Sequence, residues 1–96
     1  MRIRNVVHRG LRRFIENNET SGIASSSIEK IRNMVTFLLE MGNAKELEVF
    51  PAWKAHQLTG PRKGTWSLSV TRNWRITFRI DHNKNEILDL DYEDYH

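Results

Sequence analysis

The sequence predicts an α+β fold in which two N-terminal helices pack on one face of a mainly antiparallel sheet. Three observations support this fold class. Apolar residues recur at helical spacing in the first half of the chain, they alternate with polar residues in the second half, and the change occurs near position 50. The length of 96 residues suits one hydrophobic core. We therefore expect one domain, which spans residues 1–96.

The first half of the chain is expected to begin with a short strand at 3–7 and a helix over about 10–17. A second, longer helix follows, because apolar residues recur every three or four positions along one face. These residues are Ala24, Ile28, Ile31, Val35 and Leu38.

The ends of this longer helix carry their own signals. Ser26 and Glu29 have the spacing of a capping box, and Gly42 suits the left-handed residue that follows a last helical turn. A short helical turn is expected at 44–49, and Pro51 then marks a break.

The second half is expected to form strands, because apolar and polar residues alternate there. The strands run through 64–70, 74–80 and 86–92, with polar turns at 71–73 and 81–85. Asn73 suits the positive φ angle of a tight hairpin. Trp66 and Trp74 share a face with aliphatic residues, which predicts that both lie in the core, whereas Trp53 is left unassigned.

The charges are divided sharply along the chain. The net charge is +3, yet residues 51–80 contain no Asp or Glu, while residues 81–96 contain six acids and a single lysine. If the helices cover the apolar side of the hairpin, the other side carries Ser67, Ser69, Arg75, Thr77 and Arg79. Such a basic, acid-free face is a credible cradle for single-stranded nucleic acid, although strand residues that face water are polar in most proteins.

The composition also excludes several classes of function. The chain has no cysteine, which rules out disulfides, a thiol nucleophile and thiolate metal sites. The four histidines are far apart in the sequence, so we expect no metal and no cofactor. No segment has the length of a membrane span or the apolar core of a secretory signal, which predicts a cytoplasmic protein without a membrane partner.

Four motifs in the second half resemble those of a known toxin family. They are Leu58-Thr59-Gly60, Gly64-x-Trp66-Ser67, Asn73-Trp74-Arg75-Ile76-x-Phe78 and Tyr92-Glu93-Asp94-Tyr95-His96. Together they resemble the plasmid-maintenance killer toxins of the HigB family, within the RelE/ParE-like superfamily, and the likeness covers most of the chain. The resemblance implies a toxin of a type II toxin–antitoxin system that cuts mRNA in the ribosomal A site and inhibits translation. It also implies a HigA-like helix-turn-helix antitoxin.

The catalytic positions of the family carry over individually. The resemblance implies catalytic roles for His56, Arg75, Asp94, Tyr95 and His96. Some relatives have a lysine before the glycine of the first motif, where this chain has Thr59; Lys54 or Lys63 can replace that phosphate contact. The basic residues expected to bind RNA are Lys54, Arg62, Lys63, Arg72 and Arg79.

These residue types suit RNA cleavage without a metal. A base must take the proton from a ribose 2′-OH, a cation must stabilise the phosphate and an acid must protonate the leaving 5′-oxygen. Two histidines and an arginine fit these roles, and the spacing leaves open which histidine is the base. Two alternatives stay open: a ParE-like gyrase poison, whose members generally lack the histidine and Tyr-His set, and a plain RNA-binding module.

Overall fold

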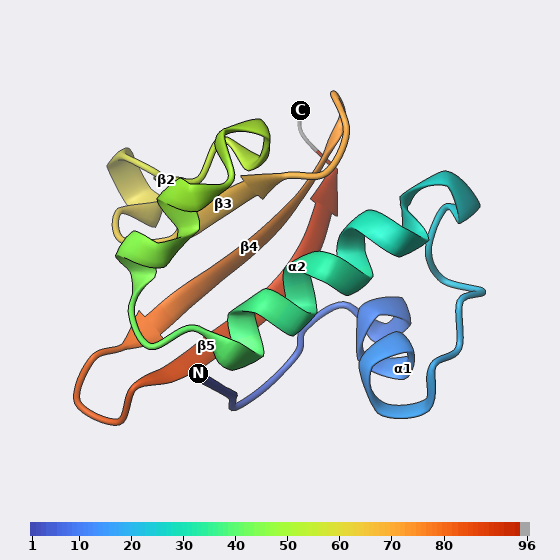
Figure 1. The fold of residues 1–96 in the computed structure, drawn as a ribbon, viewed down its shortest axis with the longest axis horizontal. Helices are drawn as coiled ribbons and strands as arrows, with labels where there is room; N and C mark the ends of the chain where they lie inside the picture. Colours follow the sequence, from blue (N-terminus) through green and yellow to red (C-terminus); the bar gives the residue numbers. More distant parts are fainter. Residues whose placement is uncertain (95–96) are drawn as a thin grey trace.

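The structure of the protein is a computed structural model, which describes residues 1–94. Its strands and α-helices are β1 (Arg2–Ile3), α1 (Arg9–Asn17), α2 (Ile28–Glu40), β2 (His56–Gln57), β3 (Trp66–Ser69), β4 (Trp74–Asp81) and β5 (Glu86–Asp94). Short 3-10 helices are η1 (Ser25–Ser27), η2 (Ala44–Val49), η3 (Pro51–Trp53) and η4 (Gly60–Arg62). Figure 1 shows α2 lying across one face of the sheet, with α1 beside it. The predicted α+β class is confirmed.

Within residues 1–94 the strands form a five-stranded sheet in the order β1-β5-β4-β3-β2. The pairs β2–β3, β3–β4 and β4–β5 are antiparallel, whereas β1 runs parallel to β5. The sheet is therefore mainly antiparallel, as predicted. The acidic strand β5 lies inside the sheet, between β1 and β4, so its side chains meet those of both neighbours.

The core lies between the helices and one face of the sheet. Helix α2 buries Ile31, Met34, Val35 and Leu38, which confirms most of the apolar stripe seen in the sequence. Strands β3 and β4 contribute Leu68, Ile76 and Phe78 to the same core, and each of these is at most 1% exposed. Removal of apolar area from water at this interface is the main force that holds the helices on the sheet.

The predicted ends of α2 are wrong. The turn around Ser26 is the 3-10 helix η1, and the N-cap residue Ser27 makes no side-chain capping bond. A capping box occurs instead at η2, where the Asn43 side chain accepts from the Lys45 N–H and Glu46 accepts from the Asn43 N–H. Gly42 has no positive φ angle, and its N–H donates to Glu46 at 2.7 Å.

Two strand predictions also need correction. The first strand covers Arg2–Ile3 and continues as one isolated bridge between Val6 and Leu90. The β3–β4 turn does not use a positive φ angle at Asn73. Instead, the Thr71 hydroxyl accepts the N–H groups of Asn73 and Trp74, so a side chain closes the turn.

The tryptophans link the core to the polar face. Trp53 is buried and stacks on Phe50, with ring centroids 4.0 Å apart, while the ring of Phe37 on α2 meets it edge-on at 5.8 Å. Trp66 and Trp74, predicted to lie in the core, pack against it but are only partly buried. Trp53 therefore anchors the segment just before His56. Within residues 1–94, no helix has the length and apolar character that a membrane span requires.

Candidate functional site

The sheet face turned away from the helices carries two rows of polar side chains. His56 lies opposite Ser67 and Ser67 opposite Thr77, so these three residues share one row. In the next row, Ser69 lies opposite Arg75. Antiparallel partners point to the same side of a sheet, so His56 and Arg75 lie on one face.

This face is not acid-free, contrary to the prediction. Asp91 of β5 lies opposite Thr77, and Glu93 lies opposite Arg75. The prediction counted charges along the chain, but β5 pairs with β4 and brings its own carboxylates to the same side. The register between strands, which the charge count ignored, accounts for the error.

Two of the arginines expected to bind RNA are held in ion pairs. Arg62 makes two hydrogen bonds to the carboxylate of Glu93, at 2.6 and 2.9 Å. Arg79 donates to Asp89 at 2.6 Å. The Thr77 hydroxyl also donates to Glu93, and Ser67 and Thr77 are only 3% and 1% exposed. This part of the face is therefore closed over rather than open to solvent.

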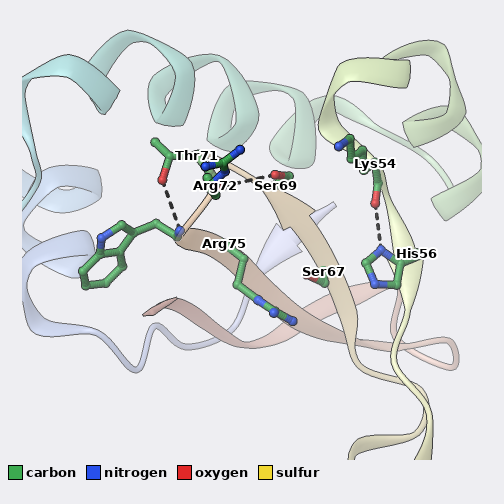
Figure 2. A pocket seen from close by; sticks show the side chains of 8 residues that line it. Lys54, His56, Ser67, Ser69, Thr71, Arg72 and Arg75 are labelled. Carbon is green, nitrogen blue, oxygen red and sulfur yellow. Dashed lines mark hydrogen bonds between the residues drawn. The ribbon is translucent and has the colours of Figure 1, made fainter. Parts of the chain in front are cut away.

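A pocket of about 250 Å³ adjoins this part of the face, toward the place where β3 ends and β4 begins. It is lined by Lys54, His56, Ser67, Ser69, Thr71, Arg72, Trp74 and Arg75. Figure 2 shows the Arg75 side chain extending over the sheet toward Ser67 and His56. The pocket thus brings together four predicted site residues, and no carboxylate occurs among its described lining residues.

The His56 ring is oriented by a backbone group. Its Nδ1 atom lies 2.8 Å from the carbonyl oxygen of Lys54 (Figure 2). Because a carbonyl can only accept, Nδ1 carries the proton and donates it. The other ring nitrogen, Nε2, is then left to exchange a proton with a bound molecule.

Lys54 reaches this geometry through an unusual backbone conformation. Its φ angle is +49°, in the left-handed region that a residue with a Cβ atom seldom adopts. Such a conformation costs on the order of 1 kcal/mol and persists where surrounding contacts hold it. Two hydrogen bonds hold it here: the Lys54 N–H donates to the Pro51 carbonyl at 3.1 Å, and the Lys54 carbonyl accepts from His56 Nδ1 at 2.8 Å.

The two acids beside the pocket have pKa values that move in opposite directions. The hydrogen bonds from Arg62 hold the pKa of Glu93 below its usual value, with further lowering by Thr77 and by the charge of Arg75. Burial raises the pKa of Asp91, and the charge of Glu93 adds to this effect. Glu93 is therefore a firmly ionised carboxylate at neutral pH.

Of the remaining predicted site residues that the structure describes, none lines the pocket: Arg62, Lys63, Arg79 and Asp94. Lys63 follows η4 and is exposed. Asp94 lies opposite Trp74 at the end of β5, so the described chain ends beside a residue that lines the pocket. Tyr95 and His96 lie outside the described residues.

Sequence reasoning missed Glu93 and Asp91 as neighbours of the site. The signal was present, since acidic residues alternate with apolar ones in the last strand just as Arg75 and Thr77 do in the strand before it. Pairing these two strands in register would have placed the acids beside the arginine. Within residues 1–94, no group of three His, Asp or Glu side chains is arranged to hold a metal ion.

Three solved structures share the fold. The YafQ structure from E. coli strain BL21(DE3) has a TM-score of 0.57 at 13% identity, over 88% of this chain and 80% of its own. The YoeB/ParE toxin from Agrobacterium tumefaciens has a TM-score of 0.55 at 17% identity, over 100% and 99%. The toxin–antitoxin complex RelBE2 from Mycobacterium tuberculosis gives 0.50 at 16% identity, over 96% and 94%. The fold is therefore that of RelE- and ParE-like toxins.

The sequence comparisons are more specific. Residues 4–96 match the family model described as the RelE-like toxin of the type II toxin–antitoxin system HigB. The Endoribonuclease HigB of Proteus vulgaris is 35% identical over 94 residues, which cover 98% of this chain and 99% of that protein. The chain belongs to the HigB-like family of RelE-like toxins. Membership of a type II toxin family implies an antitoxin partner.

Proposed function

We propose that this toxin is an endoribonuclease that cuts mRNA in the ribosomal A site and thereby inhibits translation in the cytoplasm. The observation that carries the proposal is the pocket in which His56 and Arg75 lie with Lys54 and Arg72, without a carboxylate in its described lining. Support also comes from the Proteus vulgaris relative, which is named an endoribonuclease.

The proposed reaction is attack by a ribose 2′-oxygen on the adjacent phosphorus. A base removes the 2′-OH proton, the new P–O bond forms, and the bond to the 5′-oxygen breaks as an acid protonates that oxygen. The products are a 2′,3′-cyclic phosphate and a 5′-hydroxyl end. The Nε2 atom of His56 suits either proton transfer, because the Lys54 carbonyl already holds Nδ1.

The cations of the pocket suit the phosphate. The guanidinium of Arg75 presents a planar fork of donors that matches two phosphate oxygens. It would stabilise the charge that builds up on those oxygens in the transition state. Lys54 and Arg72, at the rim, would bind flanking phosphates.

We assign the second proton transfer to the C-terminal residues. Tyr95 or His96 would serve as the partner of His56, and Asp94 would orient one of them. Because so few acid–base groups are available, cleavage should depend on the ribosome to hold the mRNA in a reactive geometry. Deletion of Tyr95 and His96 should abolish cleavage while the far-ultraviolet circular dichroism spectrum is retained; full activity of the shortened chain would contradict these roles.

The test of the function is cleavage of a defined mRNA in ribosome complexes with the A site empty. Primer extension should reveal new 5′ ends inside the reading frame, and the same RNA without ribosomes should stay largely intact. An intact message on ribosomes would refute the proposal. Inhibition of DNA supercoiling by gyrase would then support the gyrase-poison alternative, and tight RNA binding without cleavage would support a binding module.

We further propose that the antitoxin is a HigA-like helix-turn-helix protein. A type II antitoxin is a protein that binds its toxin directly. The antitoxin should therefore copurify with the toxin when both are expressed together. A short reading frame next to the toxin gene, with the spacing of a helix-turn-helix motif, would identify the candidate. Capture of a partner without that motif would contradict this assignment.

A further inference from the structure

The connection between β2 and β3 is a closed loop with a narrow attachment to the sheet. The Leu58 N–H donates to the Thr65 carbonyl at 2.8 Å, and the Thr65 N–H donates to the Arg62 carbonyl at 3.0 Å. Gly60 and Gly64 have φ angles of +71° and +90°, which allow the chain to fold back on itself. The strand β2 that precedes this loop pairs with β3 through only two residues, His56 and Gln57.

An ion pair ties this loop to the far side of the sheet. Arg62 of the loop binds both carboxylate oxygens of Glu93 on β5. In the sheet order, β3 and β4 lie between β2 and β5, so the ion pair links parts of the sheet that are not neighbours. Thr77 donates to the same carboxylate from β4. The bridge therefore joins the β2–β3 loop to strands β4 and β5 on the polar face of the sheet.

The Arg62–Glu93 ion pair, which we call the clamp, is only partly buried. The side chains of Arg62 and Glu93 are 49% and 24% exposed, and the pKa of Glu93 lies below its usual value, chiefly because of the hydrogen bonds from Arg62. A half-exposed ion pair contributes little to global stability. Its effect should instead appear locally, in where the loop and the short strand β2 lie.

We propose that Glu93 is a positioning residue: by clamping Arg62, it fixes the β2–β3 loop, and with it His56, relative to Arg75. Neither Glu93 nor Arg62 lines the pocket, while Glu93 lies directly opposite Arg75 in the β4–β5 register. The expected loss of activity rests on the proposed ribonuclease function, whereas the position of the β2–β3 loop does not depend on it.

A positioning role of Glu93 and a direct role of Arg62 in RNA binding predict different results for the substitution Glu93→Gln. If Arg62 bound RNA directly, the substitution Glu93→Gln would release it and raise RNA affinity. If Glu93 positions the site, Glu93→Gln and Arg62→Gln lower kcat equally, and the double variant is no worse than either single variant. Loss of the Glu93 charge also leaves the pocket more positive, so KM should not rise.

The experiment compares four proteins on ribosome-bound mRNA: the parent chain, Glu93→Gln, Arg62→Gln and the double variant. We expect kcat to fall about tenfold in all three variants, since small displacements of a reacting group cost one to two orders of magnitude. The matched control is Glu86→Gln, because Glu86 is also on β5 and also pairs with an arginine, Arg4, but at the opposite end of the strand. Its kcat should stay within about twofold.

Hydrogen exchange measured on the free protein separates the clamp from the function. The Leu58 amide, which bonds to Thr65, should exchange about tenfold faster in Glu93→Gln than in the parent chain and be unchanged in Glu86→Gln. If the parent chain fails to cut mRNA, the ribonuclease proposal fails, while faster exchange still upholds the clamp. Unchanged exchange, a lower KM with undiminished kcat, or additive losses in the double variant would each overturn it.

Discussion

The two ends of strand β4 carry arginines in very different surroundings. At the end near Asp81, Arg79 pairs with Asp89, and Arg4 of the neighbouring edge binds Asp81 and Glu86 at 2.7 and 2.6 Å. At the other end, Arg75 lines a pocket with other cations and without a carboxylate among the described lining residues. The difference shows that the acids of the neighbouring strand determine the surroundings of each arginine: Asp89 pairs with Arg79, whereas Glu93, opposite Arg75, is bound by Arg62.

The sharpest test of this contrast is at His56. The variant His56→Gln keeps a side chain that can hydrogen-bond but cannot transfer a proton, so the cleavage rate on ribosomes should fall about 10³-fold. His82, which is exposed in the β4–β5 turn at the opposite end, provides the control His82→Gln with unchanged rate. Equal rates in the two variants would remove His56 from the chemistry.

The second largest effect is expected at Arg75. Removal of its charge in Arg75→Ala should reduce the cleavage rate about 10²-fold, because a preorganised cation would be lost from the phosphate. The control Arg4→Ala removes an arginine that binds Asp81 and Glu86, at the opposite end of β4 from the pocket, and should keep its rate within about twofold. Circular dichroism should show both variants folded; an unfolded Arg75→Ala protein would point to a structural role.

A smaller effect is expected at Arg72 on the pocket rim. If Arg72 contacts one phosphate, Arg72→Ala should reduce by about one the slope of log affinity against log salt concentration for ribosome-bound mRNA. Arg13, which is exposed on α1, supplies the control Arg13→Ala, whose slope should match that of the parent chain. Parallel slopes for all three proteins would mean that Arg72 makes no phosphate contact.

The smallest effect is on thermal stability, where Asp91 and Glu93 of β5 should respond to pH in opposite ways. Burial raises the pKa of Asp91 above its usual value of 3.8, so its charged form opposes folding once the pH exceeds the folded-state pKa. Asp91→Asn, which keeps the acceptor for the Tyr92 N–H, should therefore raise Tm slightly at pH 7. The gain should vanish as the pH falls below 3.8, where the carboxyl group is neutral in both states.

Glu93→Gln should behave in the opposite way. The folded-state pKa of Glu93 is lowered from 4.5, so its charge stabilises the fold above that value and loses this effect as the pH falls through the folded-state pKa. Thermal melts of both variants between pH 3 and pH 7, on the order of ten points each, would check the two signs. Shifts of the same sign would contradict the assigned causes.

Local patterns in the sequence predicted most of the fold. The stripe on α2 and the alternation in β3 and β4 depend on side-chain spacing within one element, so they can be recognised without a structure. Helix ends were harder, because whether Ser26 or Asn43 caps a helix depends on the backbone at one residue. The parallel pairing of β1 with β5 joins opposite ends of the chain and left no local signal.

The site was predictable only in part for the same reason. Alternation alone placed Arg75 on the polar face, whereas His56 came to that face through two residue pairs between β2 and β3. Only the family resemblance predicted that His56 and Arg75 lie on the same face. The carbonyl of Lys54 that orients His56 depends on a left-handed backbone angle, which no side-chain pattern in the sequence reveals.

Trp74 gives the protein a built-in optical probe. Its indole stacks on Tyr92, with ring centroids 4.5 Å apart, and the same residue lines the pocket beside Arg75. Because Trp74 lines the pocket, we expect its emission to change when a ligand enters, whereas Trp53 is buried among other aromatic rings. The fluorescence of Trp74 is the difference between the emission of the parent chain and that of Trp74→Phe. This difference should allow ligand entry to be followed in real time without an attached dye.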